Sequence, residues 1–292
     1  MSLLKVIVLA IVQGLAELLP VSSSAHVIVA EKLMGLDPSA PQMTLLLVML
    51  HTGTMFAVIA YFWSTWKSAY FSNKDLFRRF VVGVIWATVL TGIIGEGIKK
   101  LLEHTVLRGA AKAEIEQMFS HLEWIAPALA AVGVLILIAG IVEHRKHPAA
   151  NERSVPSKLT LRQAGWMGVV QGLALPFRGF SRSGSTISIG MLTGTAKEDA
   201  ERFSFALAVV LTPAVVALEA LRLWKAAHLA DAHIDLHASF LSSLLGMVFS
   251  FFAGLLALKW LSRWLETGRW YLYGIYCLAA SAIVFYLHGR GF

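Results

Sequence analysis

Hydrophobic residues occur in long uninterrupted blocks along this chain, separated by short polar segments. Six of these blocks are each near the ~20 residues that cross a bilayer as a helix. They cover residues 44–63, 81–98, 122–142, 203–223, 239–258 and 270–287. The pattern predicts an all-α integral membrane protein with six transmembrane helices.

Two further stretches, residues 3–36 and 161–194, are hydrophobic at both ends but contain Pro, Gly and Ser in the middle. Backbone groups released by such breaks need partners inside the protein or in a wet cavity. We therefore expect each stretch to form a re-entrant helical hairpin instead of a complete crossing. A signal peptide is the alternative for the first stretch, but Gln13 and Glu17 interrupt its hydrophobic part.

The two broken stretches are related in sequence. "VQGLA" occurs at residues 12–16 and 170–174, each time followed by a proline, a Ser-rich segment and three hydrophobic runs. Since an odd number of crossings separates the two copies, the second is turned over relative to the first. We expect an inverted-topology repeat of residues 1–148 and 149–292 within one membrane domain, joined by the polar segment 143–162.

Composition agrees with a membrane protein and narrows its partners. Of the 292 residues, 57% are hydrophobic and only 15% charged, and the mean hydropathy is +0.67. A formal charge of +7 would suit nucleic acid, but the basic residues lie between the hydrophobic runs, where they orient membrane proteins. We expect the lipid bilayer as partner and no nucleic acid. The single cysteine, Cys277, excludes a disulfide within the chain.

The distribution of Lys and Arg predicts the orientation. The face whose loops carry Lys67, Lys74, Arg145 and Arg162 holds the larger share of these residues. Positive loops remain in the cytoplasm, so this face should be cytoplasmic. The first hairpin would then open to the outer face.

Polar side chains gather in the middle of both broken stretches, where unpaired polar groups are costly. The first stretch contributes Gln13, Glu17, Ser22, Ser23, Ser24 and His26, and the second contributes Arg178, Ser181, Arg182, Ser183 and Thr186. Hairpins that enter from opposite faces would meet near the midplane. We therefore expect these residues to form one shared polar site.

The segment "GFSRSGST" has the chemistry of a phosphate site. It places a guanidinium between hydroxyls on a glycine-containing loop, directly before an expected helix start near Thr186. Arg182 is the strongest candidate, because an arginine at membrane depth needs an anionic partner. The alternative is a purely structural ion pair between Arg182 and Glu17.

Glu17 has two candidate roles, as a general base or as an oxygen ligand of a divalent cation such as Mg²⁺ or Ca²⁺. Gln13, one helical turn earlier, could offer its amide oxygen to the same cation or bridge the hairpins by hydrogen bonds. His26 and Ser23 are candidates for nucleophile or proton carrier, and the sequence does not separate these roles. His51 either supports the site or makes a simple helix contact.

The serines also have a structural interpretation, since hydroxyls commonly cap a helix start. For any one residue of the run from Ser22 to Ser24, capping the second helix of the hairpin is the simpler expectation.

These residues resemble the motifs of the bacitracin-resistance, or undecaprenyl-diphosphate phosphatase, family. The matching positions are Gln13, Glu17, Pro20, Ser22, Ser23 and His26 in the first motif, and Gly179, Ser181, Arg182, Ser183 and Thr186 in the second. Arg178 stands where the family has a proline, which adds a second cation near the expected phosphate. The resemblance extends over essentially the whole chain.

The resemblance implies hydrolysis of undecaprenyl diphosphate to undecaprenyl phosphate and inorganic phosphate, on the outer side of the bacterial cytoplasmic membrane. This reaction recycles the cell-wall lipid carrier and is linked to bacitracin resistance. Arg182, Ser181 and Ser183 would hold the diphosphate, and the polyprenyl chain would lie between spans. The alternative is a secondary transporter or flippase of a phosphorylated polyprenyl lipid, because inverted repeats with broken helices are common in transporters. The sequence leaves a homodimer open.

Overall fold

Helices account for all regular structure in the computed structural model, which describes residues 2–38, 40–105, 121–146, 159–229, 236–265 and 269–291. The described helices are α1 (Leu3–Leu18), α2 (Ser23–Leu33), α3 (Pro41–Tyr70), α4 (Lys74–Thr105), α6 (Leu122–Lys146), α7 (Leu161–Ala174), α8 (Arg182–Leu192), α9 (Lys197–Leu229), α10 (Leu236–Leu265) and α11 (Tyr271–Gly289). Most of the linker expected between the two halves, residues 147–158, lies outside the described residues.

Six of these helices, α3, α4, α6, α9, α10 and α11, are long and hydrophobic enough to cross a membrane. This confirms the six predicted spans. Several helices are longer than the hydrophobic runs, and α4 for example begins at Lys74 and not near residue 81. The difference arises because hydropathy detects only the hydrocarbon-buried part, while the backbone hydrogen bonds of a helix continue into the polar interface.

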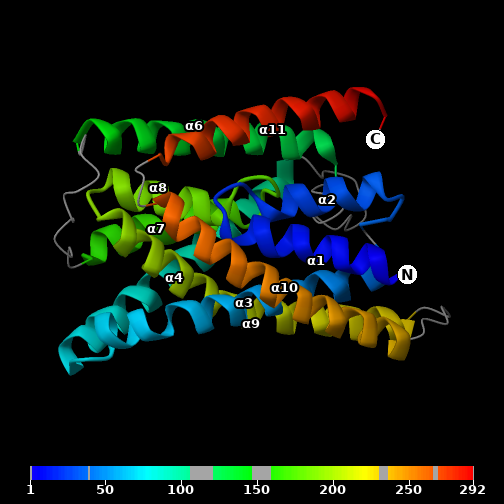
Figure 1. Cartoon of the computed structure of the whole chain (residues 1–292), viewed down its shortest axis with the longest axis horizontal. Helices are drawn as coiled ribbons and strands as arrows, with labels where there is room; N and C mark the ends of the chain where they lie inside the picture. The colour runs from blue at the N-terminus through cyan, green and yellow to red at the C-terminus, as the bar shows by residue number, and fades with distance from the viewer. Residues whose placement is uncertain are drawn as a thin grey trace.

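Each broken stretch forms two short helices joined by a loop. Residues 19–22 join α1 to α2, and residues 175–181 join α7 to α8. In Figure 1, α1 and α2 lie on the side of both chain termini, whereas α7 and α8 lie on the opposite side. The two hairpins contact each other where Ser183 Oγ donates to the Leu19 carbonyl oxygen at 3.4 Å.

Local sequence explains where these short helices begin and end. The α1 helix ends two residues before Pro20, which disfavours helical geometry at the residue that precedes it. The α8 helix begins after Ser181, whose hydroxyl accepts a hydrogen bond from the Gly184 amide at 3.1 Å. In the loop between α7 and α8, Gly179 has φ +101°, and a Cβ there would lie 2.6 Å from the Ile125 carbonyl oxygen. Only glycine fits this position.

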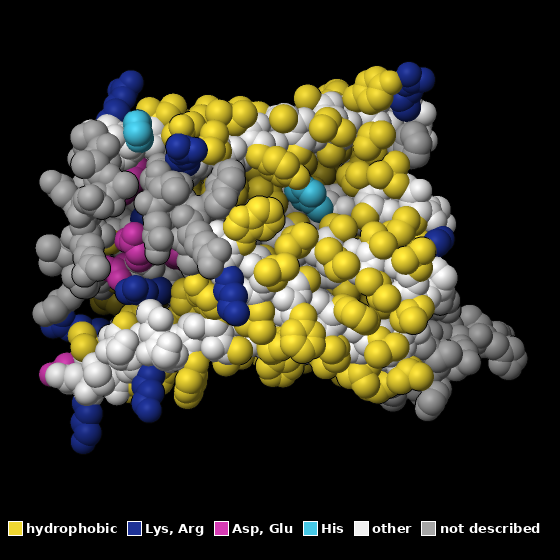
Figure 2. Space-filling view, in the orientation of Figure 1, with side chains coloured by type: hydrophobic (Ala, Val, Ile, Leu, Met, Phe, Trp, Pro, Cys, Tyr) yellow, Lys and Arg dark blue, Asp and Glu magenta, His cyan; other side chains and the backbone are white. Residues whose placement is uncertain are grey.

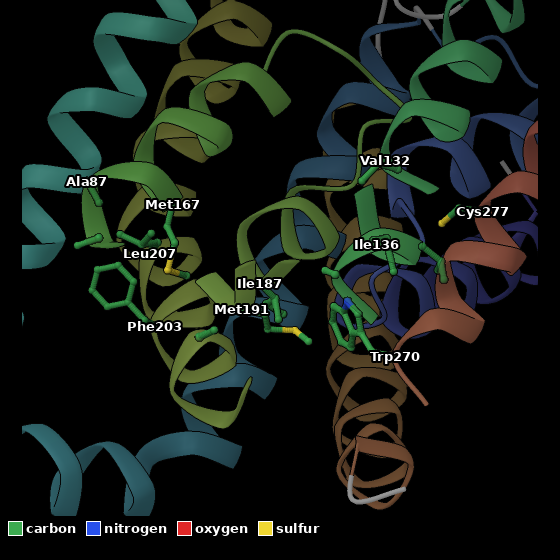
Figure 3. Close-up of a cluster of buried hydrophobic side chains, with 14 of the residues drawn as sticks. Ala87, Val132, Ile136, Met167, Ile187, Met191, Phe203, Leu207, Trp270 and Cys277 are labelled. Carbon is green, nitrogen blue, oxygen red and sulfur yellow. The ribbon is translucent and has the colours of Figure 1, made fainter. Parts of the chain in front are cut away.

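The short helix α8 is packed from both sides, which fixes the position of Arg182 at its start. Figure 3 shows Ile187 and Met191 of α8 between a group that includes Phe203 and Met167 and a second group that includes Trp270. Hydrogen bonding adds to this packing, because Trp270 Nε1 donates to Ser188 Oγ at 3.1 Å. The helix therefore has little freedom to shift.

The surface has the character expected for contact with lipid. Figure 2 shows hydrophobic side chains over most of one face, while Lys and Arg gather mainly at the end opposite the termini. Large hydrophobic side chains are exposed on several spans, including Ile93, Phe252 and Ile283. The chain is a multi-pass membrane protein, since such surfaces are not stable in water.

Candidate active site

Glu17 lies at the centre of a polar cluster that joins the two hairpins. Its carboxylate is near the end of α1, and its side chain is 15% exposed. Oε1 accepts a hydrogen bond from Arg182 Nη2 at 2.9 Å. Oε2 accepts one from Ser23 Oγ at 2.5 Å and one from Gln13 Nε2 at 3.1 Å. The structure thus brings four of the predicted site residues together.

His51 of α3 joins the same cluster. Its Nε2 lies 3.5 Å from Glu17 Oε2, and its Nδ1 lies 2.8 Å from the Leu47 carbonyl oxygen. Since a carbonyl can only accept, Nδ1 carries a proton, and the ring forms an ion pair with Glu17 when Nε2 is protonated as well. The sequence offered one signal for this contact, namely a histidine inside a hydrophobic run.

Two helix starts converge on Glu17. Ser23 is the first residue of α2 and Arg182 is the first residue of α8, and both bond to the same carboxylate. The first-turn N–H groups of a helix lack intrahelical partners and carry a partial positive charge. Together with the guanidinium, they form an environment that stabilises anions.

Two buried polar atoms in this cluster lack a hydrogen-bond partner among the described residues. They are Arg182 Nη1, a donor, and Gln13 Oε1, an acceptor. Buried polar groups in folded proteins are nearly always paired, so an unpaired one has a free position for a water, an ion or a ligand. Arg182 Nη1 suits a phosphate oxygen, and Gln13 Oε1 suits a cation or a donor.

A small hollow, partly open to the outside, adjoins the cluster. Polar side chains from three elements reach it, and these are Glu17, His51 and Arg182. The other lining residues, mostly apolar and largely from α3 and α9, are Leu18, Thr54, Met55, Val58, Ala208, Val209 and Thr212. Charged side chains beside apolar ones give this hollow the polarity expected at the boundary between the anionic head and the hydrocarbon chain of an amphiphile.

The remaining predicted serines lie at the junction of the two hairpin loops. The hydroxyls of Ser22 and Ser24 are 3.3 Å apart, and the Gly179 amide donates to Ser24 Oγ at 3.4 Å. Ser181 caps α8, and its Oγ lies 3.5 Å from Ser183 Oγ. These contacts join the loops beside Ser23 and Arg182.

Three predicted residues make contacts away from Glu17. Thr186 Oγ1 donates to the Arg182 carbonyl oxygen at 2.8 Å and bonds to Ser204 Oγ inside the α8–α9 interface. Arg178 interacts electrostatically with Glu31 of α2. The third residue is His26, which contacts Ser22 and Tyr276.

Both ring nitrogens of His26 are engaged. Nδ1 lies 2.7 Å from the Ser22 carbonyl oxygen, and Nε2 lies 2.6 Å from Tyr276 Oη of α11. No feature of the sequence predicted the contact between His26 and Tyr276, because a tyrosine in a hydrophobic run is ordinary in membrane helices.

Comparison with known proteins identifies the family of this chain. The family described as "Bacitracin resistance protein BacA" matches residues 6–283, which include both hairpins and His51. Undecaprenyl-diphosphatase 2 of Acinetobacter baylyi is 54% identical over 286 residues, 97% of each chain. Undecaprenyl-diphosphatase 2 of Burkholderia ambifaria is 35% identical over 98% of this chain and 96% of its own. The chain therefore belongs to the bacitracin resistance protein BacA family.

Proposed function

We propose that this protein is an integral-membrane phosphatase that hydrolyses undecaprenyl diphosphate to undecaprenyl phosphate and inorganic phosphate. Relatives named undecaprenyl-diphosphatase match it over nearly their whole length. The observation that carries the proposal is the convergence of Arg182 and two helix starts on Glu17. The product is the lipid carrier of cell-wall synthesis, and its recycling accounts for the link to bacitracin resistance.

Arg182 is proposed to hold the diphosphate. Its Nη2 is paired with Glu17 while its buried Nη1 remains unpaired, so one edge of the guanidinium can bind a phosphate oxygen. The first-turn N–H groups of α2 and α8, apart from the Gly184 amide that Ser181 caps, would add donors. Ser181, Ser183, Ser22 and Ser24 lie beside these starts and are the proposed hydroxyl donors to the same group.

Thr186 and Arg178 were also predicted to contact the diphosphate. Thr186 has its partners in the α8–α9 interface. We propose that it supports the start of α8 through its hydrogen bond to the Arg182 carbonyl oxygen. Arg178 is proposed to act as a more distant cation, because its charge is shared with Glu31.

Glu17 and Ser23 have the arrangement of a base and a nucleophile. The Ser23 hydroxyl donates directly to Glu17 Oε2, so the carboxylate can take the hydroxyl proton while the Ser23 oxygen attacks the terminal phosphorus. Alternatively, a water molecule in place of the Ser23 hydroxyl gives its proton to Glu17 and attacks the same phosphorus. The new P–O bond forms while the bridging P–O bond breaks, and undecaprenyl phosphate leaves. If Ser23 attacks, water then hydrolyses the phosphoserine. His26 was the other candidate, but its ring nitrogens are bonded to Ser22 and Tyr276.

A divalent cation, Mg²⁺ or Ca²⁺, is part of this proposal. The buried unpaired Gln13 Oε1 and the Glu17 carboxylate are the oxygen atoms that would hold it. The described residues contain no group of three or more His, Cys, Asp and Glu side chains able to bind a metal. Substrate oxygens and water would complete the coordination, as is common for Mg²⁺. When bound, the cation neutralises negative charge on the diphosphate.

Membrane placement is proposed as well. The hairpins α1–α2 and α7–α8 would be re-entrant halves of an inverted repeat, residues 1–148 and 149–292. Their location on opposite sides of the molecule supports this arrangement. Since Lys and Arg gather at the end opposite the termini, the site would open to the outer face of the bacterial cytoplasmic membrane. The polyprenyl chain would lie in the hollow between α3 and α9, and a homodimer stays a prediction.

The function is tested by phosphate release from a polyprenyl diphosphate in detergent. We expect the purified protein to release inorganic phosphate, because the proposed chemistry needs no membrane potential or gradient. A lipid transporter or flippase, which a related polar site could also serve, would release none. If no phosphate is released with any of several lipids and cations, the phosphatase proposal is wrong.

The cation is tested separately, on protein that is already shown to be active. We expect a chelator to lower phosphate release at least about 10-fold, and Mg²⁺ or Ca²⁺ to restore it. Gln13→Leu should raise the cation concentration needed for half-maximal activity, because it removes a ligand oxygen. Gln171→Leu is the matched control, since Gln171 is equally buried and its Oε1 also lacks a hydrogen-bond partner among the described residues, but its amide nitrogen bonds to Thr91 in α4 and not to Glu17. Full activity in the presence of the chelator would show that phosphate release does not need a cation.

A further inference from the structure

The loop between α1 and α2 contains an unusual backbone conformation. Ser22 has φ +69° and ψ 92°, and it is the one non-glycine residue with positive φ among those described. Residues with a Cβ rarely adopt this region unless surrounding contacts hold them there. Ser22 directly precedes Ser23, whose hydroxyl bonds to Glu17. The conformation of Ser22 therefore sets the direction of Ser23.

The Ser22 carbonyl is held by His26. It accepts hydrogen bonds from His26 Nδ1 at 2.7 Å and from the His26 backbone amide at 3.4 Å. Because a carbonyl oxygen can only accept, the ring carries its proton on Nδ1. In the neutral ring Nε2 is then an acceptor, and a group that donates to it fixes both the tautomer and the ring orientation.

Tyr276 of α11 is that donor. Its Oη lies 2.6 Å from His26 Nε2, and the two rings are stacked with centroids 5.7 Å apart and 11° between their planes. The next residue, Cys277, contacts the same loop, because its Sγ donates to the Pro20 carbonyl oxygen at 3.6 Å. Two adjacent residues of α11 thus act on the α1–α2 loop, Cys277 directly at Pro20 and Tyr276 through His26 at Ser22.

We propose that Tyr276 is a positioning residue, which acts through His26 to hold the strained Ser22 turn and so directs the Ser23 hydroxyl at Glu17. The inference rests on the proposed phosphatase function and assigns His26 to positioning. A nucleophilic or proton-transferring histidine would need a ring nitrogen free to reach the phosphate. In this structure both nitrogens bind groups of the protein.

The test compares variants that keep different parts of this chain of hydrogen bonds. Tyr276→Phe keeps the stacked ring and removes only the hydroxyl. His26→Asn retains a donor near the position of Nδ1, whereas His26→Gln places its amide near the position of Nε2. Tyr286→Phe is the matched control, because Tyr286 is an exposed tyrosine of the same helix whose hydroxyl bonds to Arg290.

We expect Tyr276→Phe to lower kcat for phosphate release about 3- to 10-fold at unchanged KM, the effect of losing one hydrogen bond. Tyr286→Phe should behave as wild type. His26→Asn should be more active than His26→Gln, because it preserves the bond to the Ser22 carbonyl. The ¹⁵N resonances of the His26 ring should report the Nδ1–H tautomer in the wild type and shift in Tyr276→Phe.

The outcomes separate this inference from the proposed function. Wild-type protein that releases no phosphate contradicts the phosphatase proposal, while the ¹⁵N measurement still tests the contact between Tyr276 and His26. Active wild-type protein with an unaltered Tyr276→Phe variant overturns the positioning role alone. If His26→Asn and His26→Gln are both completely inactive, His26 takes part directly in the chemistry and the positioning role is wrong.

Discussion

Arg182→Ala should lower phosphate release about 100- to 1,000-fold, the range seen when a preorganised donor to a developing anion is removed. The variant loses the guanidinium whose unpaired Nη1 is proposed to bind the phosphate. Arg182→Lys should recover only part of the activity, because a lysine keeps the charge but not the planar pair of donors. Phosphate release at saturating and limiting substrate would measure both effects. Arg145→Ala, at an exposed position on α6, is the control and should be unaffected.

A purely structural ion pair between Arg182 and Glu17 would also make Arg182→Ala harmful. Removal of one partner leaves a buried charge uncompensated, which costs about 3–5 kcal/mol of stability. The neutral double variant Glu17→Gln, Arg182→Met avoids this problem because it removes both charges. We expect it to fold with thermal stability near that of the wild type and to remain inactive. A folded double variant with substantial activity would show that the pair serves stability alone.

Glu17→Gln should lower kcat about 100- to 10,000-fold, as expected for loss of a general base. Substrate binding by this variant should be unchanged or tighter. The carboxylate occupies Arg182 Nη2 and repels the incoming diphosphate, so the uncharged amide should leave KM equal or lower when the cation is saturating and the loss of a proposed cation ligand is thereby offset. Separate measurement of kcat and KM tests this combination.

The matched control for Glu17→Gln is Glu96→Gln, which removes an exposed carboxylate of α4 that pairs only loosely with Lys100. It should leave both constants unchanged. A Glu17→Gln enzyme with normal kcat and raised KM would instead mean that Glu17 contributes to binding and not to chemistry.

The six spans were predictable because burial in hydrocarbon demands long hydrophobic runs. Their ends were not, since helices such as α4 continue through charged residues into the interface. The pairing of hairpins was also readable, because Arg182 could not remain at membrane depth without an anion and Glu17 was the available carboxylate. The inverted repeat itself stays a prediction.

The contacts that His51 and Tyr276 make could not be predicted from the sequence. Their contacts depend on how α3 and α11 are rotated about their axes and how they pack on the hairpins, which a hydrophobic run does not encode. The same holds for Arg178, whose interaction with Glu31 is set by the path of the 175–181 loop. Spacing along one helix identified Gln13 beside Glu17, but the partners that α3 and α11 supply required the folded chain.

The hollow that adjoins Glu17 has most of its apolar lining on α3 and α9, which are both long and hydrophobic enough to cross a membrane. Under the proposed function, a polyprenyl substrate would enter sideways from the bilayer between these helices, and its long chain would never have to pass through water. The encounter is then a two-dimensional search, governed by the mole fraction of substrate in the lipid phase and by lateral diffusion. For such an enzyme, added inert lipid acts as a diluent even when the amount of substrate per volume of solution stays constant.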